Sequence, residues 1–175
     1  MKQIVKLGMC VVILLLLFGC MSMRTNTKAP MLPDNAVPNI NVKQPVAFKN
    51  ISSKSGDIII GKWVGWKVYG DLYKFTESSI GTAKNILERQ NIKVTNSAGK
   101  ILELSVYDAK SEQGAFIFGV TTALRVRTGD GLKKEYVGVQ KHGNGYGTTA
   151  AIERALAKCV KQMLNDKDII RYLEN

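Results

Sequence analysis

The two side chains best suited to nucleophilic catalysis are His142, the single histidine of the chain, and Cys159. A cysteine–histidine pair needs an accessible thiol that a nearby base can activate. Cys159 instead belongs to an apolar series that recurs every three to four residues, where a cysteine behaves as a small buried hydrophobe. We therefore expect no nucleophilic catalysis. We expect no metal site either, because one histidine and one buried cysteine cannot complete a tetrahedral zinc site.

A glycine-rich stretch, HGNGYGTT (142–149), precedes the last predicted long helix. Glycine-rich backbone at a helix N-terminus can bind anions. However, the stretch has no lysine after Gly147, does not match GxGxxG, and does not open a strand–helix–strand unit. The carboxylates of Asp108 and Glu112 flank a strand end, where acidic residues are common in turns. The sequence thus offers no catalytic residue and no cofactor site, and we expect a protein that is not an enzyme.

Lipid attachment at Cys20 is the chemistry that the sequence does support. Residues 7–19 are uncharged and follow Lys2 and Lys6. This run is too short for a membrane span of roughly 20 residues, but it suits the apolar part of a secretory signal. Its end, LFGC (17–20), resembles the lipobox of bacterial lipoproteins. The resemblance implies a signal peptide over residues 1–19 and an acylated Cys20, the alternative being an ordinary export signal with a chance cysteine.

The resemblance to lipoproteins also implies a location. Two or more acyl chains hold a protein stably at a membrane without spanning it. Residue 21 is methionine and not aspartate, which in lipoproteins of Gram-negative bacteria implies the outer membrane, facing the periplasm. We expect no disulfide, since Cys159 would be left as the single unmodified cysteine.

The chain carries 25 Lys and Arg against 14 Asp and Glu, a net charge of +11. Two of the positive charges belong to the expected signal peptide, so a net charge of +9 would remain. An exported basic protein rarely meets nucleic acid, so we expect no nucleic-acid partner. Anionic lipid or glycan of the envelope, or an envelope protein complex, would suit the charge better. The alternative is that the lysines serve solubility alone.

The rest of the chain divides at about Val46. Residues 20–45 contain all four prolines and show no apolar period, which predicts a flexible tether after the lipidated cysteine. Residues 46–175 are predicted to form a single domain. Its expected strands are 58–69, 92–95, 101–108, 115–127 and 133–142, and its expected helices are 76–91 and 148–164, with a short segment after them.

Two signals define the expected architecture. Asp130-Gly131 lies between two alternating runs, which is a strong hairpin signal. Residues 148–164 have the clearest helical period of the chain. The order of elements predicts an α+β fold in which helices pack on one face of a mostly antiparallel sheet. In the helix over 76–91 we expect Thr76 as the N-cap and Asn91 as the left-handed stop.

Two surfaces are candidates for binding. The aromatic side chains of Trp63 and Tyr69 would share a strand face with Lys67, a combination that suits a lipid or protein interface. The alternative is that the last helix covers this face. A basic cluster around the predicted hairpin tip could contact anions, or could simply be a solvated turn. It consists of Arg125, Arg127, Lys133 and Lys134.

Together, LFGC, the segment ILERQNIKV and the basic hairpin followed by an apolar helix resemble the YajG-like small envelope lipoproteins. The resemblance implies an outer-membrane location and no established chemistry. We therefore expect a membrane-anchored, non-enzymatic accessory or binding protein of the cell envelope. The alternative is a carrier or chaperone of a lipid-like or anionic ligand, with the Trp63 and Tyr69 face as its pocket.

Overall fold

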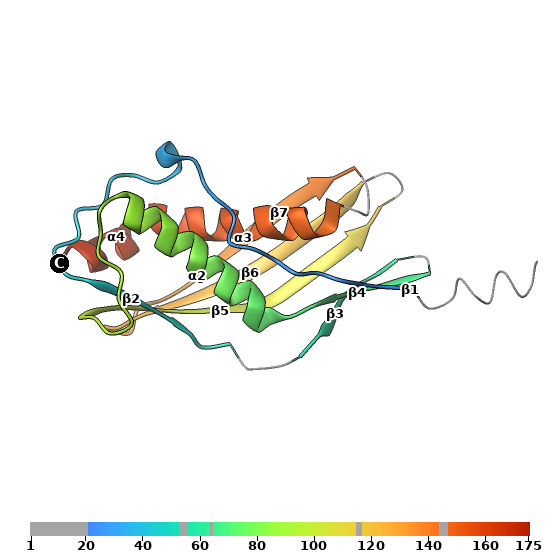
Figure 1. Ribbon diagram of the computed structural model, residues 1–175, viewed down its shortest axis with the longest axis horizontal. Coiled ribbons are helices and arrows are strands. Elements are labelled where there is room, and N and C mark those ends of the chain that lie inside the picture. Colours follow the sequence, from blue (N-terminus) through green and yellow to red (C-terminus); the bar gives the residue numbers. More distant parts are fainter. Residues whose placement is uncertain (1–20, 53–55, 64, 115–116, 144–146) are drawn as a thin grey trace, which may run out of the picture.

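The computed structural model of the protein describes residues 21–52, 56–63, 65–114, 117–143 and 147–175. The predicted signal peptide and Cys20 lie outside the described residues. The described part has the α+β fold that the sequence predicts. Two sheets and the helices pack around a shared hydrophobic core, and the molecule is elongated (Figure 1).

The larger sheet has the strand order β2-β5-β6-β7. Its strands are β2 (Val46–Asn50), β5 (Lys100–Gln113), β6 (Phe118–Thr128) and β7 (Lys133–His142). The pairs β5–β6 and β6–β7 are antiparallel, whereas β2 runs parallel to β5. The Asp130-Gly131 turn joins β6 to β7 as predicted, with Gly131 at φ 94°. The predicted strand over 92–95 is reduced to a single bridge between Val94 and Val46.

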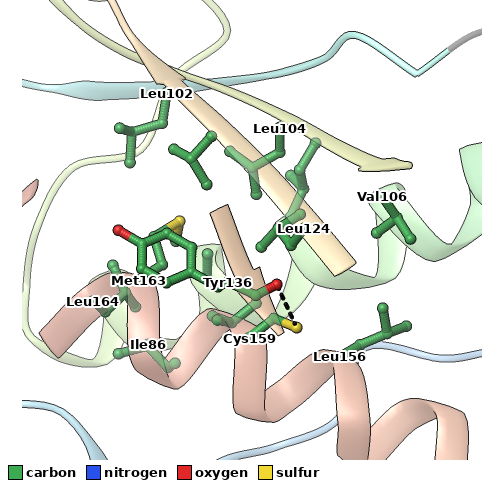
Figure 2. Close-up of a cluster of buried hydrophobic side chains, with 14 of the residues drawn as sticks. Ile86, Leu102, Leu104, Val106, Leu124, Tyr136, Leu156, Cys159, Met163 and Leu164 are labelled. Atoms are coloured by element: carbon green, nitrogen blue, oxygen red, sulfur yellow. Dashed lines mark hydrogen bonds between the residues drawn. The ribbon is translucent and has the colours of Figure 1, made fainter. Parts of the chain in front are cut away.

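Helices α2 (Leu72–Arg89) and α3 (Thr148–Asn165) cover one face of this sheet, and α4 (Lys167–Glu174) follows α3. The apolar stripe of α3 is buried as its period predicts. It consists of Ile152, Ala155, Leu156, Cys159, Val160, Met163 and Leu164. Figure 2 shows part of this stripe packed with Leu124 and Tyr136 of the sheet.

Helix α2 begins four residues earlier than the sequence suggests. Asp71 is its N-cap and accepts hydrogen bonds from the amides of Tyr73 and Lys74 at 2.9 and 3.2 Å. Thr76 is therefore inside the helix, and the prediction that it caps the helix is wrong. Asn91 has φ 59° after the helix, in agreement with the predicted left-handed stop.

The hydroxyl of Thr76 has a different role, at the edge of β5. The pairing of β2 with β5 ends at Asn50 and Leu104, so the amide of Val106 has no strand partner on that side. Thr76 Oγ1 accepts this amide at 2.8 Å and lies fully inside the protein. A helix side chain thus completes the hydrogen bonding of a strand edge.

Replacing Thr76 by valine, which has nearly the same shape, should leave the buried amide of Val106 without an acceptor. We expect the free energy of unfolding to fall by about 2 kcal/mol, since an unsatisfied buried donor costs its full desolvation. Urea denaturation measures this change. Ser79→Ala is the matched control, because the Ser79 hydroxyl donates to the Phe75 carbonyl of its own helix and has no other hydrogen bond within the described ranges. Equal losses for the two variants would contradict the assigned role.

The predicted strand over 58–69 is two strands and a turn. β3 (Ile58–Trp63) and β4 (Trp66–Gly70) pair as an antiparallel hairpin around Gly65, which has φ 74°. β1 (Met21–Arg24) runs parallel to β4 and completes a second, three-stranded sheet in the order β1-β4-β3. We call β3 and β4 with their turn the tryptophan hairpin, because it carries both tryptophans of the chain.

Residues 21–45 are not the flexible tether that the sequence suggests. After β1, residues 25–45 form a strap that crosses the helices and includes a short 3₁₀ helix, η1 (Asp34–Ala36) (Figure 1). Side chains of α2 bind its backbone: Ser78 and Thr82 donate to the carbonyls of Lys28 and Pro30 at 2.6 and 3.1 Å. The strap also adds to the buried core, through Ala36, Val37 and Ile40. The folded unit therefore includes the strap and β1.

Candidate functional site

The tryptophan hairpin separates the three residues of the first predicted surface. In the register of the hairpin, Trp63 lies opposite Trp66, and Tyr69 lies opposite Ile59. Alternation along β4 places Trp66 on the side of the fully buried Val68, and Tyr69 on the other side. Trp63 thus faces the interior, whereas Lys67 and Tyr69 face outward. The structure therefore separates Trp63 from Lys67 and Tyr69, and Trp63 and Tyr69 cannot line a shared pocket.

The inner side of the hairpin packs against one end of the larger sheet. The ring of Trp63 contacts that of Phe118 at a centroid distance of 4.8 Å, and Phe118 stacks on His142 at 5.4 Å. Close approach is possible because residue 61 is glycine: a Cβ there would lie 2.5 Å from the carbonyl oxygen of Ser111. These contacts hold the hairpin against β5 and β6.

The outer side of the hairpin carries two exposed lysines. Lys62 and Lys67 lie directly opposite each other on β3 and β4. Among the described residues, no carboxylate lies within ion-pair distance of either one. Like charges directly opposite on neighbouring strands are destabilising. The fold therefore keeps two positive charges close together, and the part of the chain that the structure describes supplies no counter-charge for them.

The second predicted surface, the basic cluster, is also divided. In β6 and β7, Arg125, Arg127 and Lys133 point away from the helices, and Lys134 points toward α4. Three of the four are in ion pairs: Arg125 with Glu135 at 2.8 Å, Arg127 with Glu103 at 2.5 Å, and Lys134 with Asp168 at 2.6 Å. Only Lys133 has no ion-pair partner in the described part of the chain, so the cluster offers little free positive charge.

The pKa directions follow these ion pairs. The hydrogen bond from Arg125, with a second from Tyr107, holds the pKa of Glu135 below its ordinary value. The hydrogen bond to Asp168 raises the pKa of Lys134. Each of these two shifts favours the charged form of its group and so supports the ion pair to which it belongs.

Sequence reasoning missed an apolar strip on the helix-free face of the larger sheet. Val137 and Val139 of β7 are 48% and 47% exposed, and Tyr107 of β5 is 38% exposed. The guanidinium of Arg125 lies over the Tyr107 ring, 4.6 Å from its centroid. The sequence of β7 does contain a signal for this strip. Valines occupy positions 137 and 139, where the alternation of the strand would place polar, solvent-facing residues. Tyrosine and arginine beside exposed aliphatic side chains are typical of protein interfaces.

The candidate catalytic side chains do not form a site. The thiol of Cys159 is buried, and burial raises its pKa. It lies 3.5 Å from the carbonyl oxygen of Tyr136 (Figure 2) and 3.5 Å from that of Thr122. The ring of His142 instead stacks on Phe118. Within the described ranges, no three His, Cys, Asp or Glu side chains come together as metal ligands would. None of the described helices has the length and apolar character needed to cross a membrane.

A small groove lies where the strap meets the end of α2. Its volume is about 50 Å³, and Pro33, Ile86 and Arg89 are among its lining residues. Pockets for small molecules typically measure roughly 300–1,000 Å³, so this groove is too small to hold a lipid-like ligand.

These features define an α+β domain whose surface carries an exposed lysine pair on the tryptophan hairpin and an apolar strip on the helix-free face of the larger sheet. The fold is similar to that of protein XCC0632 from Xanthomonas campestris, described as a DUF330 protein. The match has a TM-score of 0.55 and 14% sequence identity, and it covers 83% of this chain and 93% of that one. At this identity the likeness concerns the fold alone. No family model and no curated protein matches the sequence.

Proposed function

We propose that the protein is a lipid-anchored, non-enzymatic accessory protein of the bacterial cell envelope, held at the periplasmic face of the outer membrane through Cys20. The observation that carries the proposal is the position of β1. The first residue after the lipobox cysteine, Met21, already pairs with Trp66 in the second sheet. A lipid on Cys20 would therefore attach directly to the folded domain and hold it at the membrane surface.

The helix-free face supports an accessory role. A domain anchored through its β1 end leaves this face accessible, with the apolar strip of Tyr107, Val137 and Val139 available to a protein partner. The ion pairs of Arg125 and Arg127 flank the strip and would give the interface a polar rim. The alternative role as a carrier of a lipid-like ligand has less support, because Trp63 and Tyr69 lie on opposite sides of their hairpin.

The lipid anchor is tested by substituting each cysteine of the N-terminal region in cells. We expect the wild-type protein to remain in the membrane fraction after high salt and alkaline carbonate, and its N-terminal peptide to begin at an acylated Cys20. Cys20→Ala should abolish both results. Cys10→Ala is the matched control, since this cysteine lies within the expected signal peptide. An unmodified N-terminal peptide that begins elsewhere would overturn the proposal.

Cross-linking in the intact envelope tests the accessory role. Lys110, Lys133 and Lys141 belong to the helix-free face by strand register, whereas Lys161 is exposed on α3. We expect reproducible cross-links from the first three lysines to one membrane protein complex, and few from Lys161. Cross-links distributed evenly over all lysines, or none to protein, would argue against an accessory role at this face.

A further inference from the structure

The lysine pair of the tryptophan hairpin lies close to the expected lipid. In the register of the second sheet, Met21 pairs with Trp66 and Ser22 pairs with Lys67. Neighbouring strands are about 4.8 Å apart, so Met21, the residue that follows Cys20 in the sequence, lies about this distance from the start of β4. Figure 1 shows β1, β3 and β4 meeting at one end of the long axis, and the β6–β7 turn at the other end.

The charges at this end are suited to an anionic surface. Lys62 and Lys67 are exposed and face each other across the hairpin, with no described carboxylate to compensate them. The other exposed cation of the small sheet, Arg24, is already paired with Asp57 at 2.9 Å. An external anion between the two lysines would remove their mutual repulsion. The repulsion therefore destabilises the isolated domain, and contact of the two lysines with phosphate groups would remove this destabilisation.

The inner side of the hairpin keeps this pair in a fixed position. Trp63 packs on Phe118, and Gly61 brings β3 against Ser111 of β5. Tryptophan and lysine together are typical of protein segments at the headgroup level of a membrane. Here the tryptophans lie on the side of the hairpin that packs against the larger sheet, and the lysines lie on the solvent-exposed side.

We propose that the tryptophan hairpin is a second membrane contact, in which Lys62 and Lys67 bind the anionic phospholipid headgroups of the leaflet that holds the lipid on Cys20. This inference depends on the proposed lipid anchor. The two contacts together fix the orientation of the domain: its long axis stands away from the membrane, and the β6–β7 turn and α4 lie at the distant end. The lipid alone would hold the protein but would leave its orientation free.

Both tryptophans of the chain are in this hairpin, so tryptophan fluorescence reports on it directly. The experiment uses the full lipidated protein in vesicles of phosphatidylcholine, with or without phosphatidylglycerol, that contain lipids spin-labelled near the headgroup. We expect stronger quenching with phosphatidylglycerol than without it. Each lysine near an anionic surface contributes about 1 kcal/mol. Replacing both by glutamine should therefore lower the docking equilibrium about 30-fold.

A matched control removes the same charge at the other end of the molecule. Lys93→Gln with Lys167→Gln changes two exposed lysines outside the tryptophan hairpin and should leave the quenching unchanged. Thermal unfolding separates binding from folding. Lys62→Gln with Lys67→Gln relieves the repulsion and should not lower the melting temperature, while it lowers the docking equilibrium about 30-fold. A merely structural role would lower stability and docking together.

The possible failures can be told apart. A chain without acylation at Cys20, as shown by the mass of its N-terminal peptide, would overturn both the anchor and the docking. An acylated protein whose quenching is equal with and without phosphatidylglycerol, or is unaffected by the glutamine pair, would overturn the hairpin contact and leave the anchor intact. Cross-links from Lys62 and Lys67 to a protein would overturn it in favour of a protein partner.

Discussion

Replacing Gly138 by alanine is expected to lower the free energy of unfolding by about 3 kcal/mol, at the upper end of the usual cost of overpacking. A Cβ at this position of β7 would lie 1.9 Å from the carbonyl oxygen of Ala155 and 3.0 Å from the sulfur of Cys159. The first of these atoms belongs to the backbone of α3. It cannot move away by a side-chain rotation, so the whole helix must shift.

The close contact of α3 with β7 has a further consequence for this variant. The side chains of Lys158 and Gln162 donate to the carbonyls of Val139 and Val137 at 2.6 and 3.1 Å. β7 is an edge strand, and these bonds satisfy part of its free edge. A shift of α3 would weaken them as well.

Gly119→Ala is the matched control for Gly138→Ala. Gly119 is in the neighbouring strand, and a Cβ there would have no atom within 4 Å. Alanine at such a position reduces the freedom of the unfolded chain, so we expect no loss of stability. Urea denaturation of both variants measures the difference. Similar midpoints for the two would show that α3 is not held against β7 as described.

The second large effect is expected at Asp166, between α3 and α4. Its carboxylate caps α4 by accepting the Asp168 amide at 2.9 Å, accepts the hydroxyl of the buried Tyr136 at 2.9 Å, and lies 3.4 Å from Lys134. Replacement by alanine removes the cap and leaves a buried hydroxyl without its partner. The loss of a cap typically costs about 1 kcal/mol, and an unsatisfied buried group about 2 kcal/mol. We expect a total loss of about 3 kcal/mol.

Asp168→Ala is the control for this site. Asp168 bonds to the same lysine at 2.6 Å, but its side chain is 43% exposed, against 19% for Asp166. Exposed ion pairs typically contribute about 0–1 kcal/mol, so this variant should lose much less stability. If both variants lose the same amount, the stability of the site comes from its ion pairs and not from the buried hydroxyl and the cap.

The contribution of Asp166 also depends on pH. Burial raises the pKa of its carboxyl, but the Asp168 amide, the Tyr136 hydroxyl and Lys134 outweigh this effect and place the pKa below the ordinary value. A pKa lowered by folding means that the stabilisation is fully present above the unfolded value, 3.8, and is lost as the pH falls through the folded value. The difference between the wild type and Asp166→Ala should therefore shrink in acid. A constant difference down to the lowest pH at which the protein stays folded would contradict this prediction.

The parts of the fold that the sequence predicts are those with strong local signals. The β6–β7 hairpin follows from Asp130-Gly131 between alternating runs, and α3 follows from its apolar period. In contrast, the turn between β3 and β4 contains only a few residues within a mainly apolar segment, residues 58–69. A hairpin with apolar residues on both strands then has the same pattern as one long strand. The outward-facing pair of Lys62 and Lys67 exists only because of this turn, so sequence reasoning could not find it.

The strap was missed for another reason. An extended segment that uses side chains of a helix to satisfy its backbone has no period of its own. The signal is in the partner: Ser78 and Thr82 are small polar residues at helical spacing on a nearly buried part of α2. Gly81 adds to it, since a Cβ there would lie 2.8 Å from Ala29 of the strap. Small polar residues on the buried side of a helix, where apolar residues are expected, indicate that an irregular segment covers the helix and that its backbone binds to them.

The strap also determines how the protein would bear mechanical force. A pull on Cys20 would enter the domain along the axis of β1, and the hydrogen bonds to β4 run across that axis. The bonds would therefore be loaded in shear and would have to break together. Behind β1, the bonds of Ser78 and Thr82 to the strap would pass the remaining force to α2. An envelope protein stretched between the membrane and a partner would then resist tension through its fold, without a loose segment that extends first.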